Sequence, residues 1–304
     1  MTKDALEISE WFKNLQDRIT TALEIADGKG KFRQDLWDRS GGGGGRTRII
    51  QNGAIIEKGG VNFSAVHGQT PEFMRIQKGH EKFEADTFFA TGVSIVMHPE
   101  NPHVPIIHMN VRYFESGDGS DYWFGGGIDL TPHYINVSDG QFFHTSLNKV
   151  CNKFNEAYYQ KFKSWADDYF FIRHRNETRG IGGIFFDQLK HENESGVKKE
   201  TVWKFVQEVG NSFVPIYTSI MEMNKEKPYN SEEKKWQMIR RGRYVEFNLV
   251  YDRGTKFGLE SEGRTESILM SLPPQAEWLY DYKVEKGSPE AKTLEYLKKG
   301  INWV

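Results

Sequence analysis

An alternating stretch in the middle of the chain constrains the fold more than any other feature. In HMNVRYFE, residues 108–115, polar and apolar side chains exchange places at every step up to Tyr113. Successive side chains of a strand point to opposite faces, so His108, Asn110 and Arg112 would share one face of a sheet. A helix would scatter these residues around its circumference. The stretch therefore predicts a strand with one apolar face and one polar, cationic face.

The same alternation recurs in the stretches GVSIVMHP, GGIFFD and YVEFNLVYD. It would place Ser94 and His98 on one face of a strand, and Phe185 and Asp187 on one face of another. Two explanations remain open. An antiparallel sheet can leave one face in water. Solvated faces favour Lys, Glu and Thr, however, whereas the strands between 94 and 112 carry Ser, His, Asn and Arg, which favours a cleft for a polar, anionic ligand.

Helical periodicity is strong elsewhere. The first residues, about 25 in number, are predicted to form an amphipathic helix that ends at DGKG. Further helices are predicted at 139–171, 199–223 and 231–241, and from the N-cap Ser288 with Pro289 to Gly300. Strands are predicted over much of 49–135, at 242–254 and at about 265–271. Without repeats or a change of composition, this order predicts one α+β domain, an antiparallel sheet with helices against it.

The glycine run SGGGGGRTR at 40–48 is too flexible for the interior of a helix or strand. It is interpreted either as a linker or mobile loop, or as a lid whose Arg46 and Arg48 meet an anionic ligand. A P-loop is excluded because no Gly-Lys-Ser/Thr follows the glycines.

Composition limits the classes of protein that the chain can represent. The 40 Lys+Arg against 42 Asp+Glu and the pI near 6.5 argue against a nucleic-acid partner. The single cysteine, Cys151, permits no disulfide within the chain. No apolar stretch is long enough for a membrane span, and the N-terminus resembles neither a signal peptide nor a presequence. We therefore expect a cytoplasmic protein.

Arginines and histidines are the strongest candidates for binding and catalysis. A planar guanidinium matches a carboxylate, so a ligand with several carboxylates would need a set of arginines in Gly-rich surroundings. The candidates are Arg46, Arg48, Arg112, Arg175, Arg179 and Arg264. For the cluster RHRNETRG, a charge network at a helix end is the alternative. Among the nine histidines, the spacing of His98, His108, His144 and His174 leaves a metal site open but does not indicate one.

Six blocks of the sequence resemble the signature blocks of oxygen-dependent coproporphyrinogen III oxidase. They are GVNFSAVHG, HMNVRYFE, WFGGGIDLTPHY, RHRNETRGIGGIFFD, EFNLVYDRGTKFGL and GRTESILMSLPP. The resemblance implies one domain over 1–304, with an N-terminal helical segment at 1–39 and a catalytic core at 40–304. It implies a large, flat antiparallel sheet between helices, a homodimer and no organic cofactor. The implied reaction of haem biosynthesis converts two propionates of coproporphyrinogen III to vinyl groups with O2, and gives protoporphyrinogen IX, CO2 and hydrogen peroxide.

The resemblance also assigns individual residues. His108 matches the histidine usually assigned as the proton donor, and Asp187 matches an aspartate thought to meet the pyrrole N–H groups. The implied substrate-binding residues are Ser94, Asn110, Val111, Arg112, Glu262, Gly263 and Arg264. The arginine pattern adds Arg175 and Arg179 to them. His98, His108, His144 and His174 match divalent-metal ligands of some bacterial relatives. Gln188 departs from the family by replacing a second acid, and Glu262 stands where many relatives have Gly.

The chemistry of a porphyrinogen agrees with the predicted polar face. One buried carboxylate could accept hydrogen bonds from the four pyrrole N–H groups, and guanidinium groups would bind the propionates. His108 or Asp187 would supply the acid or base. Two other classes of protein stay open: a metal-dependent oxygenase or hydrolase that uses the four histidines, and a tetrapyrrole carrier that needs the arginines alone.

Overall fold

A computed structural model describes residues 2–70, 85–190, 197–260 and 264–304 of the chain. Within these residues, seven strands form one sheet in the order β1-β2-β3-β4-β5-β6-β9, with every neighbouring pair antiparallel. The strands are β1 Arg33–Asp38, β2 Gly43–Gln51, β3 Ile56–Gln69, β4 Thr87–Pro99, β5 Ile106–Ser116, β6 Tyr122–Thr131 and β9 Gly183–Leu189. A small hairpin, β7 Phe171–Ile172 with β8 Glu177–Thr178, encloses the 3-10 turn η1 Arg173–Arg175.

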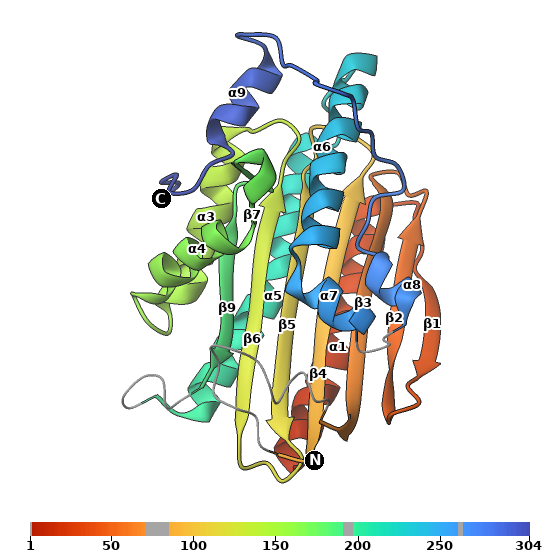
Figure 1. Cartoon of the computed structure of the whole chain (residues 1–304), viewed down its shortest axis with the longest axis vertical. Coiled ribbons are helices and arrows are strands. Elements are labelled where there is room, and N and C mark those ends of the chain that lie inside the picture. The colour runs from red at the N-terminus through yellow and green to blue at the C-terminus, as the bar shows by residue number, and fades with distance from the viewer. Residues whose placement is uncertain (1, 71–84, 191–196, 261–263) are drawn as a thin grey trace.

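Helices cover both faces of the sheet (Figure 1). Behind the strands in that view lie α1 (Lys3–Asp27) and α5 (Lys199–Asn224), and in front lie α6 (Ser231–Val250), α7 (Arg253–Glu260) and α8 (Thr265–Leu269). The remaining helices, α3 (Val137–Asn152), α4 (Tyr158–Tyr169) and α9 (Pro289–Tyr296), gather toward the β9 edge. The predicted fold class, α+β with a large antiparallel sheet between helices, is confirmed.

The predicted alternation on β4 and β5 is confirmed by burial. Val93, Ile95, Met109 and Val111 are fully buried in the main core, on the face that packs against α1 and α5. We call this face the core face. The other face, which carries Ser94, His108, Asn110 and Arg112, has partly exposed side chains at these positions, and we call it the polar face.

The glycine run is a loop only at residues 40–42, which form the turn between β1 and β2, so neither the linker nor the lid interpretation describes the whole run. Gly43, Gly44 and Gly45 belong to β2; all three pair with β3, and Gly44 and Gly45 also pair with β1 on the other side. A Cβ on Gly44 would lie 2.2 Å from the carbonyl oxygen of Trp37, so the close packing of strands requires glycine here. The partner strand β1 lies in the segment 1–39, in which a helix over about the first 25 residues was predicted but no strand.

Arg46 and Arg48 point away from the polar face. Both form ion pairs with Asp17 of α1, at 2.8 and 2.7 Å, and Arg46 also binds Gln16. These two arginines therefore fix α1 to the sheet and do not face a ligand on the polar face.

The predicted strand at 242–254 is wrong, because these residues continue α6 to Val250. A capping box between Asn230 and Glu233 starts the helix, and no Pro or Gly turn stops it before the end of the alternating stretch. Tyr244, Phe247 and Asn248 are buried at helical spacing, so the same letters satisfy a period of 3.6 as well as a period of 2.

Two other boundaries differ from the prediction. The segment 265–271 is mainly the short helix α8, not a strand. The single helix expected at 139–171 is divided into α3 and α4, because Asn155 forms a turn in which its side chain accepts the backbone N–H of Ala157. The helices predicted at the N-terminus, at 199–223 and after Ser288 are confirmed, and Ser288 caps α9 with Pro289 at its first position.

Candidate functional site

The register of the sheet brings the predicted polar residues together on the polar face. Ser94 of β4 lies opposite Asn110 of β5, which lies opposite Gly127 of β6. Two residues away from Asn110 on β5, in either direction, His108 lies opposite Asp129 and Arg112 lies opposite Gly125. Within the described residues, the centre of this face is therefore a floor of small or polar positions with charged groups at its two ends.

The side chain of Arg112 lies over positions that are occupied by glycine. It sits between Gly92 of β4 and Gly125 of β6, and a Cβ on Gly125 would lie 2.6 Å from Arg112 Nε. The guanidinium donates to Asn110 Oδ1 at 2.7 Å and pairs with Asp187 Oδ1 at 2.7 Å. Glycine at 125 thus lets the side chain of Arg112 reach from β5 over β6 to β9.

A bulge sets the direction of Asp187. The register between β6 and β9 shifts so that Asp187 and Gln188 together oppose Gly125, and Gln188 adopts a left-handed φ of 48°. Asp187 stays on the polar face with Phe185, while Leu189 returns to the core. Burial opposes ionisation of Asp187, but the charge and hydrogen bond of Arg112, the N–H of Gln188 and the charge of Arg253 together hold the pKa of the carboxyl below its ordinary value.

The other end of the face carries a histidine–carboxylate pair. His108 Nδ1 lies 2.8 Å from Asp129 Oδ1, and Arg179 Nη2 donates to both oxygens of Asp129 at 2.9 and 2.8 Å. Burial alone would raise the pKa of Asp129. The contacts with Arg179 and His108 together lower it by more than burial raises it, so the pKa of the carboxyl lies below its ordinary value. Asp129 was not predicted, although Gly125, Gly127 and Asp129 alternate on one face of GGGID, as His108 does in its own strand.

Aromatic side chains and a further arginine form a wall beside Asp187. Tyr169 stacks on Phe185 with ring centroids 4.1 Å apart, and Arg253 lies over both rings. The Tyr169 hydroxyl donates to Asp252 at 2.8 Å, and Arg253 helps to lower the pKa of Asp187. Sequence reasoning placed Phe185 on the face of Asp187 but missed Tyr169 and Arg253; Arg253 lies in the segment 242–254, which was interpreted as a strand.

The remaining predicted ligand-binding residues are distributed over several places. Arg264 caps α8 and pairs with Asp35 of β1, at the edge of the sheet remote from β9. Glu262 and Gly263 lie outside the described residues. The side chain of Val111 is fully buried in the main core and points away from the polar face.

Arg175 belongs to an ion network and not to the polar face. It grips Glu246 with two hydrogen bonds, Nε to Oε2 at 2.9 Å and Nη2 to Oε1 at 2.7 Å. His174, Arg243 and Trp278 also contact this carboxylate, and together with Arg175 they lower the pKa of Glu246 to about 2 despite burial, which opposes the shift. The charge-network interpretation of RHRNETRG thus describes Arg175, whereas Arg179 turns inward.

The four histidines considered for a metal do not form a donor set. His98 is buried beside Tyr244 with Nε2 on the carbonyl oxygen of Ser271, and burial together with nearby positive charges holds its pKa well below the ordinary value. His144 lies on α3, where Tyr159 and the carbonyl of Ile181 bind its two nitrogens, and burial lowers its pKa to about 3.

His174 contacts Tyr251 and Glu246 through its two nitrogens, and His108 has Nδ1 on Asp129. Each histidine thus belongs to a different group of contacts. Among the described residues, moreover, no three His, Cys, Asp or Glu side chains are placed to hold one ion. The residues present therefore do not fit the metal site that the resemblance implies.

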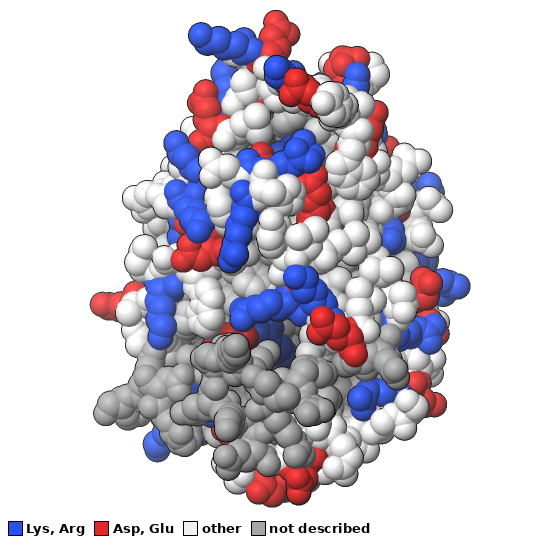
Figure 2. Space-filling model, in the orientation of Figure 1, with Lys and Arg blue, Asp and Glu red and all other residues white. Residues whose placement is uncertain are grey.

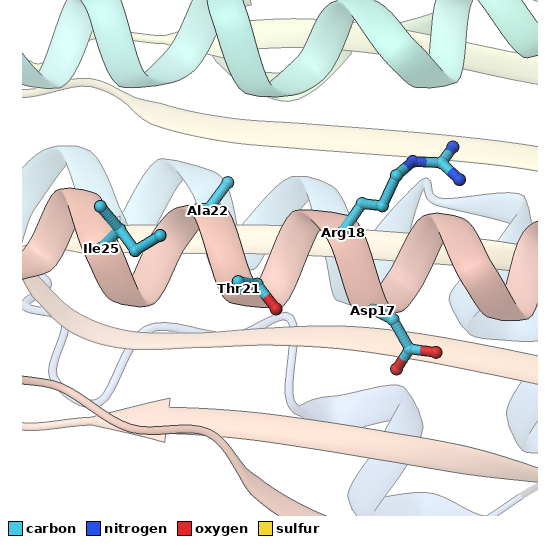
Figure 3. A pocket seen from close by; sticks show the side chains of 5 residues that line it. All are labelled: Asp17, Arg18, Thr21, Ala22 and Ile25. Carbon is cyan, nitrogen blue, oxygen red and sulfur yellow. The ribbon is translucent and has the colours of Figure 1, made fainter.

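Basic side chains, with some acidic ones among them, lie on the described surface on this side of the sheet. Figure 2 shows Lys and Arg side chains gathered over α7 and over the β7–β8 hairpin, on the side of the sheet that α6 and α7 cover. A hollow on α1, lined by Asp17, Arg18, Thr21, Ala22 and Ile25, lies along one helix (Figure 3) and shares no residue with the polar face.

These features define a class of α+β protein, in which one face of an antiparallel sheet is core and the other presents cationic and proton-carrying side chains. Comparison with known proteins specifies the class further. A model of the coproporphyrinogen III oxidase family matches residues 7–303, and the chain belongs to this family. It is 48% identical over 303 residues to a protein of Glycine max named "Oxygen-dependent coproporphyrinogen-III oxidase, chloroplastic"; the match covers 96% of this chain and 77% of the relative.

Proposed function

We propose that this protein catalyses the oxygen-dependent conversion of two propionates of coproporphyrinogen III to vinyl groups, the step of haem biosynthesis that gives protoporphyrinogen IX. Each propionate side chain, R–CH2–CH2–COO⁻, would react with O2 and one proton to give R–CH=CH2, CO2 and H2O2. The substrate loses two electrons and O2 gains them. No organic cofactor is part of this proposal.

The observation that carries the proposal is the placement of two polar pairs that both start from strand β5. The Arg112–Asp187 pair and the His108–Asp129 pair start four residues apart on β5, roughly 14 Å along the strand. The positions between and beside them carry Ser94, Asn110 and glycines. A flat ring could lie on this floor and meet a guanidinium, a carboxylate and an imidazole at once.

Each group has a chemical task in this proposal. Arg112 binds a propionate, because a guanidinium fork matches a carboxylate. Asp187 is ionised at neutral pH and so accepts hydrogen bonds from pyrrole N–H groups. Withdrawal of an N–H proton makes the electron-rich pyrrole reactive toward O2. The peroxide formed then removes a hydrogen from the propionate as CO2 leaves, and His108 exchanges the proton.

The decisive experiment is turnover of anaerobically prepared coproporphyrinogen III, with formation of the vinyl product and of hydrogen peroxide measured in air and under argon. We expect the vinyl product to form in air but not under argon. We expect the rate of turnover to be unchanged after exhaustive chelation. Loss of activity on chelation, restored by one metal, would favour a metal-dependent oxygenase. Binding without any vinyl product would favour a tetrapyrrole carrier.

A matched pair of variants tests the site itself. Arg112→Lys keeps the charge but loses the planar fork, so we expect KM to rise about tenfold, the equivalent of one charge-assisted hydrogen bond. Arg18→Lys is the control, because Arg18 lies on the far side of the sheet and binds Asn211. An unchanged KM in Arg112→Lys would remove Arg112 from substrate binding.

We also propose that the protein is a homodimer, which light scattering of the purified protein would test. No helix in the described part of the chain is long and apolar enough to cross a membrane. Placement in the cytoplasm stays a prediction, to be checked by fractionation, since the name of the Glycine max relative places that protein in the chloroplast.

A further inference from the structure

Asp129 and Arg179 have no task in the proposed reaction, yet Asp129 contacts one of its reacting groups, His108, and Arg179 contacts Asp129. Asp129 is 1% exposed and lies between His108 Nδ1 and Arg179. The ion pair of Asp129 with Arg179 has side chains that are each 2% exposed. Two charges taken out of water in this way are costly unless the pair has a purpose or excellent geometry.

Arg179 is fully committed to this interior position. Its guanidinium is enclosed by the rings of Phe170, Tyr244 and Phe247, at 4.4, 4.7 and 4.6 Å from their centroids. Nη1 donates to Asn248 Oδ1 at 2.7 Å, and Nη2 donates to both oxygens of Asp129. If Arg179 turned toward a substrate carboxylate, it would leave the buried charge of Asp129 without its partner, which strongly destabilises a protein. Arg179 therefore serves Asp129 and not the ligand.

The ionised Asp129 restricts the protonation of His108. An ionised carboxylate can only accept hydrogen bonds, so the ring nitrogen 2.8 Å from it must carry a hydrogen. In the neutral imidazole that hydrogen is on Nδ1, and Nε2 is then the nitrogen with a free lone pair. The positive charge of Arg179 keeps Asp129 from taking this hydrogen for itself.

We propose that Asp129, held ionised by Arg179, is the positioning residue that fixes the tautomer of His108, with the hydrogen on Nδ1 and the lone pair on Nε2. Nε2 is then the atom that takes up a proton during the reaction, forms an imidazolium next to Asp129, and returns the proton. The chemical role of His108 rests on the proposed function, but the tautomer does not.

The tautomer is measured directly by NMR of protein labelled with 15N in its nine histidines, with His108→Gln used to assign the signal of His108. We expect the neutral ring of His108 to be protonated on Nδ1 in the unaltered protein. A ring protonated on Nε2 would overturn the inference, whatever the variants do. This spectrum decides the question even if a variant fails to fold.

Asp129→Asn gives the sharper test. The charge of Arg179 should attract the amide oxygen of the new Asn, so that its NH2 group faces His108 Nδ1. Nδ1 must then accept a hydrogen bond, and the hydrogen moves to Nε2. We expect this change in the spectrum together with a fall in kcat of about 10²–10⁴-fold, as the wrong tautomer causes in a serine protease, and little change in KM. A ring that keeps its hydrogen on Nδ1, or an unchanged kcat, would contradict the proposal.

The control is the same substitution at another buried carboxylate, Asp27→Asn. Asp27 binds backbone N–H groups of the turns at 29–30 and 54–56 and has no contact with the polar face. We expect its His108 spectrum and kcat to match those of the unaltered protein. If the unaltered protein made no vinyl product while His108 was protonated on Nδ1, the proposed function would fall and the tautomer assignment would stand.

Discussion

The two faces of the sheet are made by the same strands and yet depend on different physical forces. The core face is filled by apolar side chains that α1 and α5 cover, and it is stabilised by burial. The polar face is organised by polar side-chain pairs that connect strands, Arg112 of β5 with Asp187 of β9 across β6, and His108 of β5 with Asp129 of β6. Adjacent residues of one strand can therefore have unrelated tasks, and substitutions one position apart should give opposite results.

The largest effect is expected from Asp187→Ala. Loss of the carboxylate removes the proposed acceptor for the pyrrole N–H groups, so turnover should fall at least about 100-fold. The free energy of unfolding should change by only about 1 kcal/mol, because the pair with Arg112 is partly open to solvent. Vinyl formation and urea unfolding measure the two quantities.

The control for Asp187→Ala is Asp168→Ala, which breaks the exposed ion pair with Lys299 on the surface and should leave turnover unchanged. Near-normal turnover of a folded Asp187→Ala protein would end the central role of that carboxylate and, with it, the functional half of the comparison.

The next largest difference is expected between substitutions of two adjacent glycines of β6, one on each face of the sheet. Gly126 lies on the core face, where a Cβ would meet the ring of Phe186 at 2.7 Å and the carbonyl oxygen of Asn110 at 2.8 Å. Gly126→Ala should therefore lower the free energy of unfolding by about 1–3 kcal/mol through overpacking. Gly125→Ala would instead displace the guanidinium of Arg112, and we expect KM to rise about tenfold with a smaller loss of stability. Equal losses of stability in both variants would refute the assignment of faces.

Asn110 and Val111 make the same comparison one strand away. Val111→Ala should lower the free energy of unfolding by about 2 kcal/mol and leave KM unchanged, because its side chain lies in the core. Asn110→Ala removes the acceptor of Arg112 Nη1 and should raise KM severalfold, the equivalent of about 1 kcal/mol for one hydrogen bond. A KM effect of Val111→Ala would restore the substrate contact that the resemblance implies.

The smallest effect concerns pH. The carboxylate of Asp27, the last residue of α1, accepts the N–H groups of Gly30, Ile55 and Ile56. Burial opposes its ionisation, but these bonds hold its pKa below the ordinary value. A depressed folded-state pKa stabilises the protein above the unfolded-state pKa of about 3.9, and this contribution is lost as the pH falls below it. Asp27→Asn should therefore cost about 1–2 kcal/mol at pH 7 and less at pH 3, by urea unfolding at both pH values. An equal cost at both pH values would mean that ionisation of Asp27 does not contribute.

Much of the polar face could be predicted because alternate side chains of a strand point to opposite faces of the sheet. His108, Asn110, Arg112 and Asp187 were placed on this face from alternation alone, and the structure agrees. Asp129 could have been found in the same way. The ion pair of Arg112 with Asp187 could not, because it depends on the order of strands, on a glycine between them and on the bulge at Gln188.

The sequence by itself determined the local elements with one clear period: the N-terminal helix and the alternating strands β4 and β5. Only the tertiary structure decided the segments whose letters fit two periods or none. Most of YVEFNLVYD is helical because it continues α6, which begins at a capping box upstream. The glycines from Gly43 onward form a strand because neighbouring strands supply their hydrogen bonds. Local propensity differs by less than about 1 kcal/mol per residue between such alternatives, so contacts with distant parts of the chain determine which one forms.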